Sequence, residues 1–435
     1  MTELRHDTQL KNDRIDDVEL PPLLPLVRRA FKHPALMHFN RLAASVIAVN
    51  LVVLIAAVPE VPAEFASRAA LLNFALAILI RRQRLINLLF RMATAAPVTW
   101  PLKVRWTLAK VYHFGGLHVG GALAGSLWFG AFVALATVEG APVDVLVLAY
   151  ALVALFAAML ATTIPKLRAK NHNRFELVHR FGGWTSLVLL WAMTITQVGH
   201  SGEPLFSTLE FWVLAAVTVA VIAPWTRLRR VPVDIKRPSS HVAIARFTHG
   251  RKPFAGSSTA ISRSPLREWH SFANIPSPTE HGFRLTISRA GDWTGRFIDD
   301  MPSHVWVKGI TVAGVANIEV LFKKVVYVAT GSGIGPCLPH LLAQEVPALL
   351  VWSTRAPRVT FGDELVDEIL AVQPEARIWD TAEHGKPDMI RLAVAAYRDF
   401  GAEAVICISN KKLTWQVVHG LERRGIPAYG AIWDS

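Results

Sequence analysis

Six apolar segments between about residues 41 and 225 constrain the fold of this 435-residue chain more than any other feature. They read RLAASVIAVNLVVLIAAV, AALLNFALAILI, HVGGALAGSLWFGAFVALATV, VDVLVLAYALVALFAAMLATTI, GGWTSLVLLWAMTITQV and LEFWVLAAVTVAVIAPW. Most approach the roughly 20 residues that an α-helix needs to cross a bilayer. The second segment is short; it either extends backward through Phe65 or forms a short or re-entrant segment. The pattern predicts an all-α six-helix transmembrane bundle.

Charged residues alternate in sign along the connections between these segments. The basic connections carry Arg81, Arg82, Arg84, Arg91, Lys103, Arg105 and Lys110, then Lys166, Arg168, Lys170, Arg174 and Arg180, and finally Arg227, Arg229 and Arg230. The other connections carry Glu60, Glu64, Glu139, Asp144 and Glu203, with Arg68 as their clear basic residue. Because basic loops stay in the cytoplasm, we expect an integral protein of an inner or plasma membrane with both termini cytoplasmic. Omitting the second segment would invert this alternation, so we expect it to cross.

The net charge of +13 would suggest a nucleic-acid partner in a soluble protein. Here the basic residues flank apolar segments, so we interpret them as topology signals and expect no nucleic-acid binding. The two cysteines, Cys337 and Cys407, exclude a disulfide framework and a cysteine metal site. The N-terminus is polar and charged, unlike a cleavable secretory signal.

From Val231 onward the composition is that of a soluble protein. A proline-containing linker, VPVDIKRPSS, precedes the β-like runs HVAIARF, GFRLTISRA and HVWVKGITVAGV, which predict a small antiparallel β-barrel. After Lys324 strands alternate with helices, which predicts a parallel sheet. We therefore expect a polar cytoplasmic segment at 1–38, the transmembrane domain at 39–226, a barrel at 240–318 and an α/β domain at 322–435.

The run VVYVATGSGIGP places Gly331, Ser332, Gly333, Gly335 and Pro336 between a strand and a helix. Glycines let the backbone approach a pyrophosphate, which the helix N-terminus then stabilises. The alternative is a tight turn in an ordinary α/β domain. The next strand ends at Arg355, where an acidic residue would favour NAD. Arg355 could meet the 2′-phosphate of NADPH, and we therefore favour NADPH over NADH. The alternative is that Arg355 is a solvated loop charge.

At this point the chain resembles the ferric reductase and NADPH oxidase superfamily over roughly residues 40 to 435. LREWHSFANI is similar to the flavin-binding strand of that family, and RLTISRAGDWTGRF to its next strand. VVYVATGSGIGPCL and AEHGKPDMIRLAV are similar to its nicotinamide-nucleotide loop and to a later segment. The resemblance implies a cytoplasmic ferredoxin-reductase-like module, in which the barrel binds FAD and the α/β domain binds NAD(P)H.

The resemblance also implies roles for individual residues. Those expected along FAD are Trp269, His270, Ser271 and Phe272, and those expected near its phosphates are Trp293 and Thr294. Residues Gly331 to Pro336 would hold the NAD(P)H pyrophosphate. Trp433 would stack on the flavin ring and move aside when nicotinamide binds there. Trp433 and His270 are therefore the catalytic candidates. The alternative is that Trp433 is a buried side chain that anchors the C-terminus.

The chain departs from the family pattern at several of these positions. Ala273 stands where the family has a hydroxyl near the reactive flavin nitrogen, and Ser271 replaces a proline. Residues Cys407 to Asn410 replace a Cys-Gly-Pro run. These changes concern hydride transfer and nucleotide affinity more than the fold.

The family carries electrons through two hemes held by histidines of the third and fifth helices. Here the third segment offers His113 and His118, and the fifth begins with His179, all at the cytoplasmic end. The outer pair is missing, since Ala131 and Ala192 stand at its positions. The resemblance therefore implies a divergent branch with one b-type heme at most. The alternatives are a polar interfacial cluster without heme, and a quinone or lipid-headgroup site.

We accordingly expect a membrane-bound oxidoreductase that passes electrons from NAD(P)H through FAD to an inner-side heme or to a membrane-soluble acceptor such as a quinone. The alternative is a non-catalytic membrane sensor or scaffold that retains a degenerate flavin- and nucleotide-binding fold. Ala273 and the missing Cys-Gly-Pro run motivate that alternative.

Overall fold

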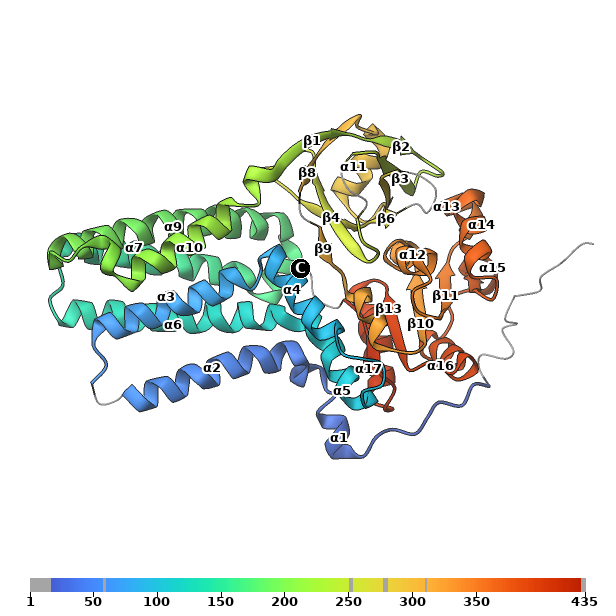
Figure 1. Cartoon of the computed structure of the whole chain (residues 1–435), viewed down its shortest axis with the longest axis horizontal. Helices are drawn as coiled ribbons and strands as arrows, with labels where there is room; N and C mark the ends of the chain where they lie inside the picture. The colour runs from blue at the N-terminus through green and yellow to red at the C-terminus, as the bar shows by residue number, and fades with distance from the viewer. Residues whose placement is uncertain (1–16, 58–59, 250–252, 277–280, 310, 432–435) are drawn as a thin grey trace, which may run out of the picture.

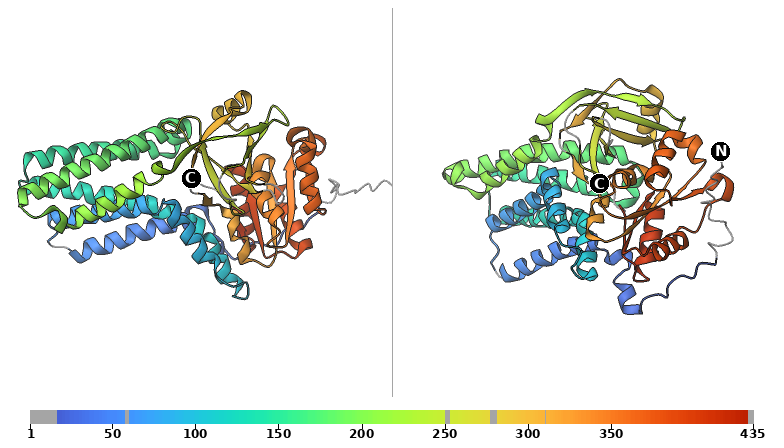
Figure 2. Two further views of the ribbon diagram at one scale, coloured as in Figure 1. Left: turned by 45° about the horizontal axis from the view of Figure 1, so that its top comes forward. Right: turned by 45° about the vertical axis from the view of Figure 1, so that its right-hand side comes forward.

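The computed structural model describes residues 17–57, 60–249, 253–276, 281–309 and 311–431. A bundle of helices forms one end of the molecule, and a β-barrel and an α/β domain lie together at the other end (Figures 1 and 2). The chain passes from the bundle into the barrel and then into the α/β domain.

The bundle contains helices that run alternately away from and toward the other two domains (Figure 1). They are α2 (His38–Ala57), α3 (Ala63–Leu79), α6 (Gly115–Val138), α7 (Val143–Thr163), α9 (His172–Ser201) and α10 (Leu209–Ile222). In the described part of the chain, five helical stretches are long and apolar enough to cross a membrane. A sixth results if α3 and α4 (Gln83–Thr94), which meet at 74°, are counted as one span. The short second segment thus extends backward past Phe65.

Glycines of α6 explain why α2 and α3 pack so closely on its two sides. A Cβ atom on Gly116 would lie 2.1 Å from the carbonyl oxygen of Phe39 in α2, and one on Gly121 would lie 2.8 Å from that of Asn73 in α3. Small residues permit this approach between helices. On α6, the glycines near the predicted heme ligands therefore allow close contact between helices.

A pair of amides ties the same three helices together. Asn50 and Asn73 donate to each other's side-chain oxygens at 3.0 and 2.7 Å, and the Trp128 indole donates to Asn50 at 2.8 Å. The polar groups of these three side chains are thereby hydrogen-bonded to one another inside an otherwise apolar bundle.

The barrel is antiparallel, as predicted. One sheet has the order β1 (Leu228–Pro232), β8 (His304–Lys308), β4 (Ser257–Ser262), β5 (His270–Ala273), with β9 (Val312–Ala313) beside β4. The other has the order β2 (Asp234–Lys236), β3 (Val242–Phe247), β7 (Phe283–Ser288), β6 (Ile275–Pro276). Because β1 continues into β2 and β5 into β6, the two sheets close on each other.

The expected boundaries of the barrel need a correction. We expected a linker at VPVDIKRPSS and a barrel from residue 240, but β1 begins at Leu228 and β2 lies within that run. Pro232 ends β1, where it costs few ladder hydrogen bonds. The chain therefore enters the barrel directly after α10 and the short turn Trp225–Arg227.

The α/β domain has the predicted parallel sheet, in the order β12 (Arg377–Asp380), β11 (Ala348–Thr354), β10 (Val325–Thr330), β13 (Ala404–Ile408), β14 (Ala428–Tyr429). Helices α12 (Ile334–Ala343) and α14 (Asp363–Val372) contribute to one apolar core, and α16 (Met389–Phe400) and α17 (Lys411–Glu422) to another. The strand order reverses between β10 and β13, which is where ligands bind in open α/β sheets.

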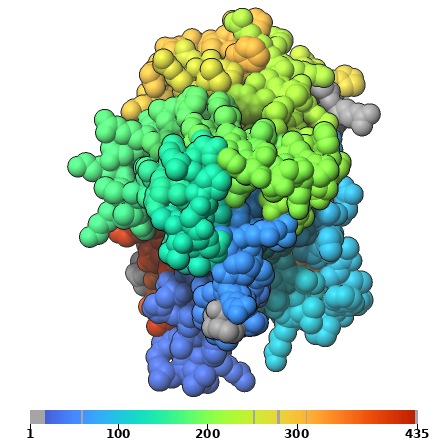
Figure 3. Space-filling model, turned by 90° about the vertical axis from the view of Figure 1, so that its left-hand side faces the viewer, coloured from blue at the N-terminus to red at the C-terminus, as the bar shows by residue number. Residues whose placement is uncertain are grey.

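A helical wedge joins the bundle to this domain. It comprises α4, α5 (Leu102–Leu108) and the 3-10 helix η3 (Ala109–Phe114), and it extends sideways from the bundle when that is viewed from its free end (Figure 3). Ile86, Phe90 and Ala109 of the wedge are buried in the same apolar core as Tyr327 of β10. The basic stretch between the second and third segments is thus a folded interdomain element.

Arg105 of α5 is the main polar contact of the wedge. Its side chain is 4% exposed, and its guanidinium donates to both carboxylate oxygens of Glu403 at 2.7 and 3.2 Å. It also donates to the carbonyl oxygen of Leu321 at 2.7 Å. Hydrogen bonding from Arg105 is the main reason why the pKa of Glu403 is lowered, so the carboxylate stays ionised.

Replacing Arg105 by methionine should destabilise the protein by about 3 kcal/mol, because Glu403 loses its charged partner and the Leu321 carbonyl loses its donor. The measurement is thermal or denaturant unfolding of detergent-purified protein. Lys103→Met, at an exposed position of the same helix, is the matched control and should be close to neutral. Equal stability of the two variants would contradict this role of Arg105.

Candidate functional site

The glycine loop lies at the reversal of strand order in the parallel sheet. Gly331 follows β10 with a φ of +47°, and its carbonyl accepts from the Trp352 indole at 3.0 Å. A Cβ atom on Gly333 would lie 2.0 Å from the carbonyl oxygen of Ile408 at the end of β13. The loop is therefore held tightly between β10 and β13, and the N-terminus of α12 begins directly behind it.

The remaining residues predicted around the nucleotide lie near the same edge. Ser332 is exposed, Pro336 is half-buried in the first turn of α12, and Arg355 is exposed just after β11. Gly335 faces the barrel, since a Cβ there would lie 3.6 Å from Cβ of Thr286 in β7. Helix α12 also contacts β5 and β6. The nucleotide loop and the predicted flavin strand are thus neighbours.

Three of the residues predicted around FAD form an aromatic stack. The ring of His270 is stacked on that of Trp293 with centres 4.1 Å apart, and the ring of Phe272 is also stacked with that of Trp293, with centres 6.2 Å apart. Trp293 belongs to the buried core of the barrel, and its indole donates to Glu268 at 3.1 Å. Trp293 therefore supports His270 from inside the barrel.

Thr294 shapes the start of α11 (Asp292–Asp300). Its hydroxyl accepts from the backbone N–H groups of Ala290 and Gly291 at 2.9 and 3.1 Å. This hydroxyl is thus used within the turn that sets the helix N-terminus. Backbone N–H groups at such a terminus suit an anionic ligand.

His270 has a ring nitrogen available for such a ligand. Its Nε2 is buried and has no hydrogen-bond partner in the described structure, and burial lowers its pKa. Ser271 beside it is exposed, and Phe272 and Ala273 are half-buried. An unpartnered imidazole nitrogen close to the N-terminus of α11 fits a flavin phosphate. Trp269 is held separately, with its indole donating to Pro265 at 2.8 Å and Lys308 lying 4.3 Å from its ring centre.

The flavin strand lies against the end of the helical bundle. Arg180 of α9 donates to the carbonyl of Leu266, just before β5, at 2.8 Å. Charges of Glu176 and His172, also on α9, act on the titration of His270. A cofactor on β5 would therefore lie near the helix that carries His179.

The three histidines predicted as metal ligands do not form one site. The rings of His118 and His179 have centres 6.2 Å apart, and His118 Nδ1 bonds to the Ala77 carbonyl at 2.8 Å. His113 instead lies 6.2 Å from the ring of His38 and lines a separate cavity, because η3 turns before α6 begins. Among the described residues, no group of three or more His, Cys, Asp and Glu is placed to hold a metal ion.

Trp433 lies outside the described residues, so its proposed stacking on the flavin stays a prediction. The polar contacts at the end of β10 were not predicted from the sequence, although Ser409 and Asn410 belong to the run that replaces Cys-Gly-Pro. The hydroxyls of Thr330 and Ser409 bond to each other across the strand reversal, and Asn410 caps α17. Short polar residues at strand ends were the available signal.

Comparison with known proteins gives relatives that are reductases by name. Residues 315–435 match the family model of the C-terminal domain of adenylate-forming reductase 03009. The chain is 40% identical over 421 residues to adenylate-forming reductase 03009 of Coprinopsis cinerea, covering 94% of this chain and 41% of that protein. Adenylate-forming reductase 06235 of the same organism is 39% identical over the same shares. The chain thus spans about two fifths of the length of these relatives.

Solved structures resemble the chain only remotely. A ferredoxin NADP+ reductase from Neisseria gonorrhoeae with bound FAD and NADP is 12% identical, with a TM-score of 0.38 over 47% of this chain and 98% of that one. A ferredoxin reductase of carbazole 1,9a-dioxygenase has the same identity and TM-score, over 47% and 70% of the two chains. Sequence identities and TM-scores this low do not indicate a shared activity.

The names of the relatives agree with the expectation of an oxidoreductase. They point to adenylate-forming reductases and do not support the finer resemblance to ferric reductases and NADPH oxidases. These comparisons do not test whether the chain lies in a membrane, whether it binds heme, or which acceptor it reduces.

Gly333 in the loop and Gly335 in α12, two residues apart, give a matched test of this geometry. Gly333→Ala should cost about 2 kcal/mol or more and disturb the loop, since its Cβ would press on the Ile408 carbonyl. Gly335→Ala should be tolerated, because its Cβ would meet Thr286 at an ordinary contact distance. Thermal unfolding and NADPH binding of both variants make the comparison; equal losses would contradict the loop geometry.

Proposed function

We propose that the chain is a membrane-bound NAD(P)H-dependent flavin oxidoreductase. The observation that carries this proposal is that the nucleotide loop and the predicted flavin strand are neighbours. The glycine loop at the strand reversal and the strand with an unpartnered His270 nitrogen lie on either side of α12. One site suits a dinucleotide pyrophosphate, the other a second phosphate-bearing cofactor.

Each group of residues would have a distinct task. The loop from Gly331 to Gly333 would present backbone N–H groups to the nucleotide pyrophosphate, with Arg355 available to a 2′-phosphate. His270, held by Trp293, would donate to a flavin phosphate beside α11. FAD, when bound, supplies hydride acceptance and onward electron transfer.

The exposed surface of the bundle supports membrane placement. Large apolar side chains on its outer helices are strongly exposed, among them Val52 at 65%, Leu127 at 70%, Val188 at 67% and Val219 at 67%. Such extended apolar faces are unfavourable in water and suit lipid. The alternation of charge along the connections supports the proposal that both termini are cytoplasmic.

His118 and His179 are the residues suited to an inner electron acceptor. Imidazole is a usual ligand of heme iron, and the ring centres of His118 and His179 lie 6.2 Å apart, so these two side chains would hold the iron between them. The bond from His118 Nδ1 to a backbone carbonyl leaves Nε2 free to ligate, as is usual for metal-bound histidine. A b-type heme therefore fits this pair, and a quinone near the same histidines is the alternative acceptor.

The relatives suggest how such a module is used. They are named adenylate-forming reductases, and the chain matches about two fifths of their length. We infer that this chain corresponds to a redox part of such proteins, because its glycine loop and barrel suit NAD(P)H and FAD. The sensor or scaffold hypothesis keeps the same fold without turnover.

The absorption spectrum of detergent-purified protein tests the proposal. We expect flavin bands that bleach when NADPH or NADH is added without oxygen. Gly335→Ala should behave like the wild type, and Gly333→Ala should bleach much more slowly. Absence of bound flavin, or flavin that no nicotinamide nucleotide reduces, would contradict the proposal and favour the scaffold.

The same spectrum tests the acceptor. If the pair holds a b-type heme, His118→Ala and His179→Ala should each remove its Soret band while the flavin remains. His38→Ala is the control, because His38 lies with His113 and not with this pair. A heme band that survives both substitutions would disprove the ligand assignment.

A further inference from the structure

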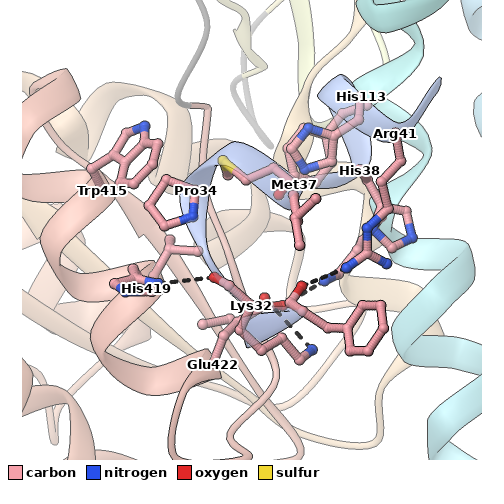
Figure 4. A pocket seen from close by; sticks show the side chains of 15 residues that line it. Lys32, Pro34, Met37, His38, Arg41, His113, Trp415, His419 and Glu422 are labelled. Atoms are coloured by element: carbon pink, nitrogen blue, oxygen red, sulfur yellow. Dashed lines mark hydrogen bonds and ion pairs between the residues drawn. The ribbon is translucent and has the colours of Figure 1, made fainter. Parts of the chain in front are cut away.

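A cavity of about 120 Å³ lies where the bundle meets the α/β domain, away from the nucleotide loop. Its walls come from the residues before η2 (Pro34–Leu36), the start of α2, η3 and α17 (Figure 4). Side chains of Lys32, Arg41, His113 and Glu422 line it (Figure 4). The cavity therefore joins segments that lie nearly 400 residues apart, as the bond from His419 to the Lys32 carbonyl also shows.

The charges that face this cavity are predominantly positive. Glu422 is paired with Lys110 at 2.6 Å and with Lys32 at 3.6 Å. Burial opposes ionisation of Glu422, but the two ammonium groups outweigh it and hold its pKa below the usual range. Arg41 adds a third cation and donates to the Phe31 carbonyl. Three cations thus face one carboxylate, which leaves an excess of positive charge.

His113 gives a second, independent indication of a ligand. Its side chain is 3% exposed, lines the cavity and has Nδ1 buried without a hydrogen-bond partner in the described structure. Its neighbours His38 and Tyr112 have ring centres 6.2 and 4.3 Å away. A buried polar atom normally has a partner, so a polar ligand atom is expected beside it.

We propose that this cavity binds a phosphate group, as carried by the headgroup of an anionic lipid. Arg41, Lys110 and Lys32 would neutralise the phosphate, and His113 would donate to it. The N-terminus of α2 also points its positive dipole end toward this region. Basic pockets at the cytoplasmic end of membrane helices commonly bind such headgroups.

The surface of α2 provides a path for the lipid chains. Ala44, Ala48 and Val52 follow Arg41 at helical spacing and are exposed. This assignment to a lipid rests on the membrane placement proposed above, whereas phosphate binding itself does not. Because α17 forms one wall and η3 with α2 the other, a bound headgroup would link the α/β domain to the bundle.

Native mass spectrometry of the delipidated full chain in detergent tests the proposal. The probes are dioctanoyl phosphatidic acid, dioctanoyl phosphatidylcholine, glycerol 3-phosphate and inorganic phosphate. We expect phosphatidic acid to bind well above phosphatidylcholine and to raise the melting temperature. Arg41→Gln and Lys110→Gln should each weaken it by about tenfold, the effect of losing one charged hydrogen bond. Arg41→Lys should retain more binding than Arg41→Gln.

Lys103→Gln, exposed on α5 and outside the cavity, is the control and should bind like the wild type. Binding of glycerol 3-phosphate as tight as that of phosphatidic acid would keep the phosphate site and assign it to a soluble ligand. Equal binding by the wild type and Arg41→Gln, or displacement of the lipid by NADPH, would overturn the proposal. Failure of flavin reduction would leave this assay unaffected, because it requires no turnover.

Discussion

The burial of the wedge formed by α4, α5 and η3 against the α/β domain is the interaction on which the arrangement of the molecule depends. Its apolar side chains complete the core around β10, while the Arg105 guanidinium is fixed by Glu403 and a backbone carbonyl. Displacing this ion pair is costly on the side of Arg105, since the buried guanidinium would lose its partners. The wedge continues directly into α6, so it fixes the bundle relative to the nucleotide loop.

That arrangement has consequences for electron flow. The barrel is connected to α10 through β1. Its flavin strand is held against α9 by the hydrogen bond from Arg180 to the Leu266 carbonyl. The same helix carries His179, which meets His118 near the end of the bundle that adjoins the other domains. In our proposal the path from nucleotide to flavin to acceptor is therefore short and remains on one side of the bundle.

Much of the fold followed from local patterns. Apolar segments of helical length gave the bundle, alternating strands gave the barrel, and VVYVATGSGIGP gave the strand, loop and helix at the strand reversal. The start of the barrel was misplaced because Pro232 and the charges around it are typical of a linker. The sequence predicted only a basic connection where the wedge lies. Its apolar face could not be recognised, because Ile86 and Phe90 are buried by the α/β domain, which is distant in the sequence.

The sites were less predictable than the fold because they depend on contacts between distant segments. Spacing placed His113 and His118 on one segment, but the turn in η3 sends His113 toward His38 and leaves His118 with His179. Trp293 was expected at a phosphate and lies in the barrel core. The cavity around Glu422 had no signal in the sequence, since each cation there was one of many basic residues at the end of a helix.

The central claim is that electrons from NAD(P)H leave the module on the side where they enter. Full chain reconstituted in sealed vesicles, with the α/β domain outward, measures this directly. We expect external NADPH to reduce a quinone dissolved in the membrane, and we expect ferricyanide sealed inside vesicles that hold no quinone to stay oxidised. Rapid reduction of the enclosed ferricyanide, with quinone absent and the vesicles intact, would contradict the account.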